Sequence, residues 1–334
     1  MGRINNKYLN FTEIYFQYEV VTMKQDRWNQ NRSFPRDWKV TNERLVVRGE
    51  FLLELDWVKS WGVELEDMNK GKRGHPYEFP ESLIKFQAVL SQWIAYRGLE
   101  GVARKLEEYN LIPKHNDYSS AYRRIVNIDP EIELPKVGTI STTTDGSGMK
   151  MNSAGEYRKD KYGNKGDKKY IRVVITADPF KKDLLDCEVF VDGEGPSEPE
   201  VAMSHLEELI KKGFDIDKFW GDGAFDVKDL FNFLQKYGIL SAIKIRKNAS
   251  DNADGSMRRA REVGEYKKDG YKEWARKKRY GRRWTGTEVI FSAVKGIFGE
   301  NTRAKNIPNM IKEVKRKFWA YQRMKRYADL RIGA

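Results

Sequence analysis

Cysteine, histidine and long apolar runs are scarce in this sequence, and each scarcity narrows the class of protein. The single cysteine, Cys187, cannot form an internal disulfide, and three histidines without close spacing argue against a zinc site. No apolar run approaches the roughly 18 residues that a membrane helix needs, and the polar start MGRINNKYLN is not a signal peptide. We therefore expect a cytoplasmic protein without a membrane partner.

Charge, in contrast, is plentiful and unevenly placed. The 334 residues carry a formal net charge of +13, and 33% of them are charged. From Ser256 to Ala334 there are 23 Lys plus Arg against 8 Asp plus Glu, or +15, so the rest of the chain sums to about −2. A basic region with interleaved aromatic residues favours a polyanion as partner, above all nucleic acid. A generally basic cytoplasmic protein is the alternative.

Length and patterning predict three regions. Residues 1–75 form an arm of unclear fold, which ends in the linker-like stretch MNKGKRGHP. Residues 76–135 are predicted to be helical, and residues 136–331 are predicted to alternate strands with helices and to end in a basic helix.

The helical region contains three short segments. The first, SLIKFQAVLSQWIAYRGL, can be stopped by Gly98; the second is LEGVARKLEEYNL; the third begins at DYSSAYRRIVNI with Asp117 or Ser119 as its cap. They resemble a helix-turn-helix unit, whose last helix exposes side chains to base edges. The candidates for DNA contact are Ser119, Ser120, Arg123 and Arg124. An ordinary three-helix packing unit with a solvated arginine pair is the alternative.

The third region carries the signals of a mixed sheet. Three strands are predicted first, at TISTTTD, YIRVVITAD and DLLDCEVFVDG, and the turn DPFKKD joins the last two as an antiparallel hairpin. There follow the helix PEVAMSHLEELIKKG, the strand IDKFWGD, the helix DVKDLFNFLQKYG and the strand ILSAIKIRK. This order is that of an α/β, ribonuclease H-like sheet flanked by helices.

Two acids fall at predicted strand ends. In TISTTTDGSGMKMN the β-branched residues favour a strand, and the glycines that follow disfavour one, so the strand is expected to end at Asp145. In FWGDGAFD a strand ends at Asp222, and Asp226 stands where the N-cap of the next helix belongs. One Asp-Gly pair is typical of a turn. Two carboxylates at strand ends predict a metal site, because the reactive crevice of an open α/β sheet lies there.

Carboxylates without nearby cysteine or histidine suit Mg²⁺ or Mn²⁺, and a site for two ions requires a third acid downstream. Glu288 opens the clearly amphipathic segment TEVIFSAVKGIFGE, and Lys295 lies two helical turns further on, where it can hold a phosphate. A solvated Glu–Lys pair is the alternative for that spacing. The other downstream acids are Asp251, Asp254, Glu262, Glu265, Asp269, Glu273, Glu300, Glu313 and Asp329.

Several motifs resemble, in their order, those of the DDE transposases of bacterial and archaeal insertion sequences. They are DGSGMK, GEYR, GDGAFD, IRKNA, YGRRWTGTEVIFSAVK and FGE. The segment RGEFLLELDWVKSWGVELEDMNKGKRG is similar to the N-terminal part of archaeal members, so the resemblance runs from about Trp38 to near the C-terminus.

The resemblance implies that Asp145, Asp222 and Glu288 are the catalytic, metal-binding triad. The family's last motif places Tyr, Arg, Glu and Lys at set spacing, although here four residues rather than three separate its Arg from its Glu. The matching residues are Tyr280, Arg283, Glu288 and Lys295.

The activity that the resemblance implies is DNA transposition. Such an enzyme binds the terminal inverted repeats of its element, uses two Mg²⁺ or Mn²⁺ ions to hydrolyse a phosphodiester, and joins the freed 3′-hydroxyl to target DNA. Two ends must meet, which implies a homodimer on double-stranded DNA and a nucleoid-associated protein. The alternatives are a structure-specific nuclease of the same fold and a non-catalytic DNA-binding protein derived from a transposase.

The final helix, AKNIPNMIKEVKRKFWAYQRMKRYADL, is expected to pack one face and to present another to DNA. An apolar stripe recurs at steps of three and four, and the cations lie largely off that stripe. We expect contacts to phosphate from Lys315, Arg316 and Arg323.

Overall fold

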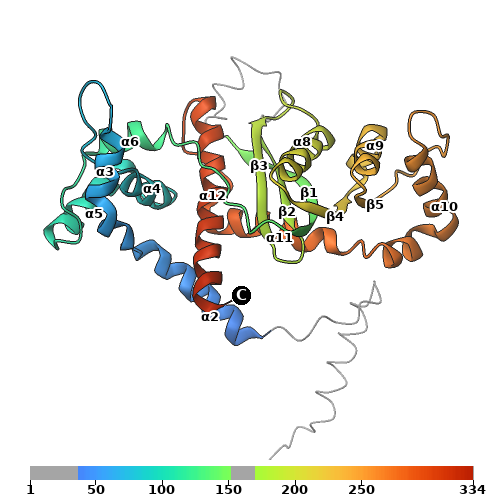
Figure 1. Cartoon of the computed structure of the whole chain (residues 1–334), viewed down its shortest axis with the longest axis horizontal. Helices are drawn as coiled ribbons and strands as arrows, with labels where there is room; N and C mark the ends of the chain where they lie inside the picture. The colour runs from blue at the N-terminus through green and yellow to red at the C-terminus, as the bar shows by residue number, and fades with distance from the viewer. Residues whose placement is uncertain (1–36, 152–169, 334) are drawn as a thin grey trace, which may run out of the picture.

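The computed structural model describes residues 37–151 and 170–333. Residues 1–36 of the predicted arm and the motif GEYR, at 155–158, lie outside this range. The N-terminal part is helical throughout (Figure 1). Its elements are α2 (Trp38–Glu50), η1 (Phe51–Leu53), η2 (Asp56–Ser60), α3 (Trp61–Asn69), α4 (Glu81–Leu90), α5 (Tyr96–Glu108) and α6 (Tyr118–Ile125).

Two local predictions for these helices meet different outcomes. Asp117 caps α6 as predicted, because its Oδ1 accepts hydrogen bonds from the backbone N–H groups of Ser119 (2.8 Å) and Ser120 (2.9 Å). The prediction that Gly98 stops the first helix is wrong. That helix ends at Leu90, and Gly98 lies in the first turn of α5, where a Cβ would come within 2.5 Å of Ile94 Cγ2. Gly98 therefore permits close packing between turns.

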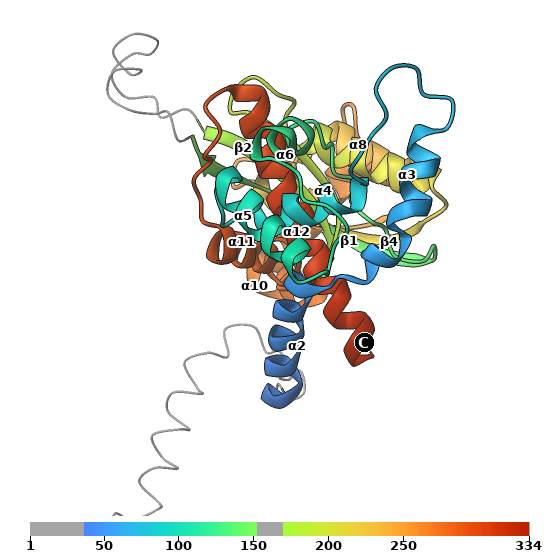
Figure 2. The same ribbon diagram turned by 90° about the vertical axis from the view of Figure 1, so that its left-hand side faces the viewer.

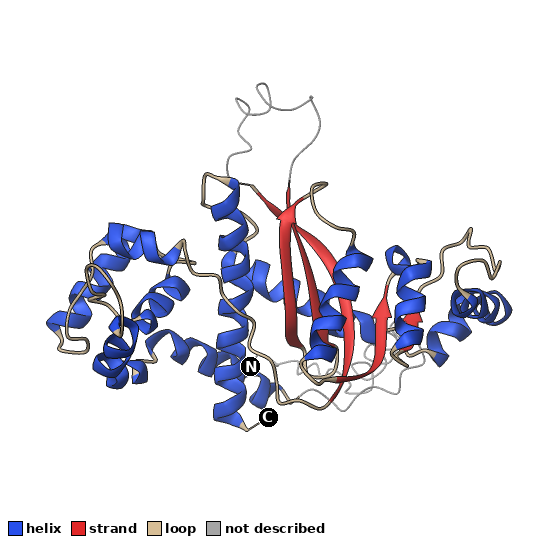
Figure 3. Ribbon diagram, turned by 45° about the horizontal axis from the view of Figure 1, so that its top comes forward, coloured by secondary structure: helices blue, strands red, loops and turns tan. Residues whose placement is uncertain are grey.

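The central sheet has five strands in the order β3-β2-β1-β4-β5. Figure 3 draws the sheet in red. The pairs β1–β2 and β2–β3 are antiparallel, and β1–β4 and β4–β5 are parallel. The prediction of a ribonuclease H-like mixed sheet is confirmed. The strands are β1 (Thr139–Lys150), β2 (Tyr170–Asp178), β3 (Asp183–Val191), β4 (Asp215–Gly221) and β5 (Leu240–Ile243).

Helices cover both faces of the sheet. On one face, α8 (Glu198–Lys211) and α9 (Lys228–Lys236) enclose a hydrophobic cluster with β4 and β5. On the other, α11 (Arg282–Phe298) and α12 (Ile307–Ile332) enclose a second cluster with β2 and β3. Between β5 and α11 lies α10 (Met257–Lys277), at the far edge of the molecule from the N-terminal helices (Figure 1). None of the described helices is both long and apolar enough to span a membrane.

The longest helix, α12, stands between the sheet and the N-terminal helices (Figure 1). Most of its buried apolar residues belong to one cluster that takes in β2 and β3 on one side and α4, α5 and α6 on the other. The other end of α12 packs against α2, and Figure 2 shows both helices projecting from the same side of the molecule. Tyr327 near that end donates a 2.8 Å hydrogen bond to Glu54. Both parts of the chain therefore share one core around α12.

The approach of α11 to the sheet depends on one glycine. A Cβ at Gly286 would lie 2.5 Å from Thr143 Cγ2 and 3.3 Å from Pro179 Cα. We expect Gly286→Ala to destabilise the fold by about 1 to 3 kcal/mol, because overpacking must displace α11 or β1. Gly296→Ala on the same helix meets no atom within 4 Å and should stabilise it by about 0.5 to 1 kcal/mol.

Chemical denaturation of both alanine variants beside the wild type measures the two effects. Equal free energies of unfolding for Gly286→Ala and Gly296→Ala would show that α11 does not lie this close to β1.

Candidate active site

Asp145 lies within β1, not at its end. The prediction that the strand stops there is wrong, because β1 continues to Lys150 and pairs with β2 through Gly146 and Gly148. Glycine has no side chain that could pack at these positions, so backbone hydrogen bonds to β2 hold the strand there. The parallel pairing with β4 ends earlier, at Thr143. Asp145 therefore projects just beyond the point where its neighbour β4 stops.

Asp222 follows β4 directly and caps the short turn η3 (Gly223–Phe225). Its Oδ1 accepts a 2.7 Å hydrogen bond from the backbone N–H of Ala224. The guanidinium of Arg246, which follows β5, donates to the carbonyl oxygens of Gly223 (2.7 Å) and Ala224 (3.1 Å). The turn that carries Asp222 is thus braced from the neighbouring strand.

Asp226 holds the backbone of Arg246, the residue that supports this turn. The prediction that it caps the next helix is wrong, since Val227 occupies that position. Its fully buried carboxylate instead accepts two hydrogen bonds from Arg259, at 2.7 and 3.1 Å, and one from the backbone N–H of Arg246, at 3.0 Å. Arg259 lies on α10, so this pair ties α10 to the loop behind Asp222.

Glu288 reaches the same region from α11. Arg283, one turn earlier on that helix, places Nη1 3.4 Å from Asp145 Oδ2 and Nη2 3.5 Å from Glu288 Oε1. The side chain of Arg283 is 12% exposed, that of Asp145 18% and that of Glu288 50%. One guanidinium therefore links two acids that are 143 positions apart in the sequence, numbered 145 and 288.

Asp222 is near enough to Asp145 for its charge to act on that carboxyl. Burial raises the pKa of Asp145 to about 6; the charge of Arg283 opposes this rise, and the charge of Asp222 adds to it. Burial also raises the pKa of Tyr280, which the charge of Arg283 lowers and the charges of Asp222 and Asp145 raise further. The charges of Asp145, Asp222 and Arg283 thus act on one another or on Tyr280, and Glu288 joins them through Arg283.

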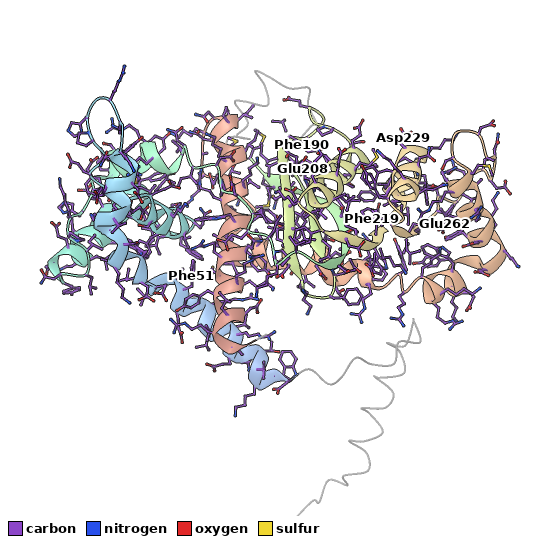
Figure 4. The ribbon with its side chains drawn as sticks, viewed as in Figure 1. Phe51, Phe190, Glu208, Phe219, Asp229 and Glu262 are labelled. Atoms are coloured by element: carbon purple, nitrogen blue, oxygen red, sulfur yellow. The ribbon has the colours of Figure 1, made fainter. Side chains whose placement is uncertain are left out.

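The other acids proposed for the third position have partners elsewhere. Glu262, labelled on α10 in Figure 4, accepts hydrogen bonds from Ser241 of β5 (2.7 Å) and from Lys278 (2.8 Å). Glu313 accepts from the backbone N–H groups of Arg303 and Ala304. Ion pairs engage Asp251, Glu265, Asp269, Glu273, Glu300 and Asp329, and Asp254 accepts a hydrogen bond from Asn252. Glu288 shares a cation with Asp145.

Lys295 lies on α11, two turns beyond Glu288 as predicted, and is partly exposed. The pKa of Glu300 is lowered chiefly by a hydrogen bond and charge from Lys150, and also by the charge of Lys295. Lys295 therefore lies toward the end of α11 that is remote from Arg283. Its predicted contact with phosphate stays a prediction.

The candidate recognition helix exposes part of its predicted set. Arg123 is exposed, in the last turn of α6 rather than near its start. Arg124 is partly buried; it donates to the carbonyl oxygen of Phe79 and lies 5.2 Å from the ring centroid of Tyr77. Ser119 donates its hydroxyl to Asp117 at 2.5 Å, and Ser120 is partly exposed. Arg123 is accordingly the best placed of these four to meet a partner.

The expectation for the final helix needs correction at Arg316. That residue is 2% exposed and donates to the carbonyl oxygen of Ile125, because α12 is covered on both sides. Lys315 is partly buried 3.9 Å from Asp129, and Arg323 pairs with Glu133. Periodicity alone predicted one packed face, whereas the helix packs almost all round in its middle.

The donor chemistry of the site fits a hard divalent cation. Asp145 and Glu288 present carboxylate oxygens to one cationic group, and Asp222 lies close enough to influence the pKa of Asp145. Within residues 37–151 and 170–333, no three potential ligands are close enough together to hold a metal ion as they stand. The acids converge on a guanidinium, and they would have to close in further around a metal.

Sequence reasoning missed the residues that support Asp222. Arg246 lies in the quoted motif IRKNA, but nothing in its spacing indicates that its side chain reaches back to η3. Arg259 lies on an exposed, charged helix and gives no periodic signal for its pairing with Asp226. The Arg246 contact depends on the course of the loop after β5, and the Arg259 contact depends on the packing of α10; only the fold reveals either.

The pKa of Asp145 makes a prediction about stability. Because its folded pKa of about 6 exceeds the ordinary value of 3.8, the native state holds this proton more tightly than the unfolded state. The contribution of Asp145 to stability is therefore lost as the pH rises from about 4 to about 6. In metal-free buffer, Asp145→Asn should become more stable than the wild type through this window, by at most about 3 kcal/mol.

Urea denaturation of both proteins between pH 4 and pH 8 measures the difference. A difference that stays constant with pH would mean that Asp145 titrates like an exposed carboxyl.

Comparison with known families identifies the family of the chain. The profile of the family described as Transposase DDE domain matches residues 142–322, more than half of the 334-residue chain. No curated protein sequence matches the chain.

Three solved structures with some similarity are transposase complexes. A piggyBac transposase synaptic complex with hairpin DNA has 10% identity and a TM-score of 0.33, over 86% of this chain and 79% of that one. A Mos1 transposase paired-end complex has 10% identity and a TM-score of 0.22, over 84% and 96%. A Drosophila P element transposase strand transfer complex has 12% identity and a TM-score of 0.26, over 85% and 88%. The matched family segment contains all three acids of the candidate site, and on that match the chain belongs to the transposase DDE domain family.

Proposed function

We propose that this protein is a DNA transposase that binds the terminal inverted repeats of an insertion sequence, cleaves DNA at their ends and transfers the freed strand to target DNA. The observation that carries the proposal is the contact of one guanidinium, that of Arg283, with both Asp145 and Glu288. Together with Asp222 beside them, this gathers acids from β1, from the end of β4 and from α11 in a chain whose family cleaves and joins DNA.

Some residues of the site would hold the metal ions, and others support the residues that do so. Asp145, Asp222 and Glu288 would hold Mg²⁺ or Mn²⁺, and two such ions, when bound, supply activation of the attacking oxygen and stabilisation of the leaving oxygen. Arg246 and Asp226 fix the turn that carries Asp222. A rigid support of this kind keeps a carboxylate in position while the other groups of a site move.

Contacts to DNA outside the acids are assigned by position and charge. Arg283 and Lys295 would orient the reacting phosphate, and exposed Arg123 on α6 would contact the repeat. Tyr280, predicted to contact DNA, is only 2% exposed, and its ring lies 5.9 Å from the Arg283 guanidinium, so it would act by positioning Arg283. Lys315 and Arg323, both only partly buried, would contribute to the basic surface if their pairs with Asp129 and Glu133 open. We infer a homodimer on double-stranded DNA in the cytoplasm, since two repeat ends have to be brought together.

The experiment that tests this proposal is incubation with double-stranded DNA that carries the flanks of the element, in Mg²⁺ and then in Mn²⁺. Products are mapped at nucleotide resolution, with Asp145→Asn as the matched inactive variant. Cleavage at the repeat end followed by joining to a second DNA is expected from the wild type alone. Cleavage without joining would indicate a structure-specific nuclease. Repeat binding without any cleavage would indicate a non-catalytic DNA-binding protein.

A further inference from the structure

Arg283 occupies an unusual place for a residue that is to contact DNA. Its guanidinium points between two acids of the candidate site, 3.4 Å from Asp145 Oδ2 and 3.5 Å from Glu288 Oε1. It is nearly buried, so its charge acts in a medium that screens less than water. A divalent cation would seek the same two carboxylates.

The contacts of Arg283 favour release over permanent anchoring. Both separations from the carboxylates are longer than a typical charge-assisted hydrogen bond of about 2.7 to 2.9 Å. Its buried Nε has no hydrogen-bond partner among the described residues. The guanidinium also lies 5.3 Å from the ring centroid of Trp284 and 5.9 Å from that of Tyr280, and neither ring fixes its direction with a hydrogen bond. Its one hydrogen bond among the described residues, from Nη1 to Asp145 Oδ2, is long at 3.4 Å, so charge holds the group in place more than directional bonding does.

We propose that Arg283 is the resident cation of the DNA-free site: its guanidinium neutralises Asp145 and Glu288 where a divalent ion would bind, and the ion binds only as Arg283 withdraws. This inference rests on the proposed function, because it takes the two acids to be metal ligands. A DNA phosphate offers the guanidinium another bidentate partner, so arrival of DNA favours the withdrawn position. Arg283 then acts as a positioning residue that couples metal binding to DNA binding.

Competition between Arg283 and a divalent ion predicts how the removal of Arg283 changes metal affinity. If Arg283 and a divalent ion exclude each other, removing the guanidinium tightens metal binding in the absence of DNA. If Arg283 instead holds the acids in the right geometry for metal, its removal weakens metal binding. A role confined to DNA contact leaves DNA-free metal binding unchanged.

The test is calorimetric titration of Mn²⁺ into the full chain without DNA. We expect Arg283→Gln to bind Mn²⁺ at least about tenfold more tightly than the wild type, a change of 1.4 kcal/mol or more. Arg283→Lys, which keeps a charge but cannot reach both acids at once, should fall between them. The matched control is Arg282→Gln, which removes the same charge from a neighbour that lies over the Phe180 ring at 5.0 Å, and it should stay within about twofold of the wild type.

The outcomes separate this inference from the proposed function. The inference is overturned if Arg283→Gln binds Mn²⁺ no more tightly than the wild type does. It is also overturned if Arg282→Gln gains as much Mn²⁺ affinity as Arg283→Gln. In the Arg283→Gln background, Asp145→Asn and Glu288→Gln should each abolish the tight site. Tight Mn²⁺ binding that survives both substitutions means that the metal site lies elsewhere, and then the proposed function fails as well. Thermal unfolding without metal verifies that each variant is folded, and Arg283→Lys carries the test if Arg283→Gln is not.

Discussion

Glu288→Gln is expected to reduce Mg²⁺-dependent cleavage at the repeat end by roughly a thousandfold while leaving DNA binding without metal intact. Glutamine has nearly the same size as glutamate and similar helix propensity, but it lacks the negative charge that a divalent ion requires. Half of the Glu288 side chain is exposed, so the substitution should not disturb the core. Single-turnover cleavage and a binding titration in EDTA measure the two effects separately.

Glu273→Gln provides the matched control for this experiment. Glu273 lies on α10, pairs with Arg276 three residues away and is 40% exposed, so the same chemical change there should cost almost no activity. Normal cleavage by Glu288→Gln combined with loss in Glu273→Gln or Glu300→Gln would show that the third acid has been misassigned. Loss of DNA binding in Glu288→Gln would instead point to a structural role.

Asp226→Ala is expected to have the largest effect on folding, about 3 to 5 kcal/mol of lost stability. The carboxylate is fully buried and is the partner of Arg259, which is 13% exposed. Its removal leaves a nearly buried guanidinium and the backbone N–H of Arg246 without their shared acceptor. Urea denaturation measures the loss directly.

Asp251→Ala removes the same group from a surface pair and serves as the comparison. Asp251 and its partner Lys267 are 61% and 50% exposed, at a separation of 3.2 Å, so the expected loss is below about 1 kcal/mol. Similar losses in Asp226→Ala and Asp251→Ala would mean that the buried pair is open to solvent. If Asp226→Ala is as stable as the wild type but no longer binds metal, Asp226 serves only to position Asp222.

The sheet could be predicted from the sequence because its signals are local. Runs of β-branched residues mark β1 and β2, and the amphipathic periods that mark α8 and α9 end at Gly213 and Gly238. Both of these glycines have positive φ, 90° and 71°, which the pattern anticipates for helix ends. Local signals failed at Asp145, because what keeps β1 going past the acid is pairing with β2, a strand that begins at Tyr170.

Two acids of the candidate site had signals that a sequence can carry, since Asp145 follows a β-branched run and precedes glycine, and Asp222 stands between glycines directly after a strand. Glu288 had only its amphipathic surroundings and its resemblance to a family motif. The link through Arg283 could not be foreseen, because it depends on how closely α11 crosses β1 at Gly286. The burial of Arg316 could not be foreseen either, because the second packed face of α12 includes charged and polar residues such as Arg316, Lys317 and Gln322, which apolar periodicity does not detect.

The central position of α12 also has a consequence for how the chain matures during synthesis. A ribosome completes α4, α5, α6 and the whole sheet before it reaches residue 307, yet much of the core that joins these elements is supplied by α12, beside the contact of Trp93 with Phe298 of α11. Until Val314, Phe318 and Trp319 arrive, those surfaces stay exposed to water and to other nascent chains. The interval between translation of the sheet and translation of α12 is therefore the period in which this protein is most prone to aggregate.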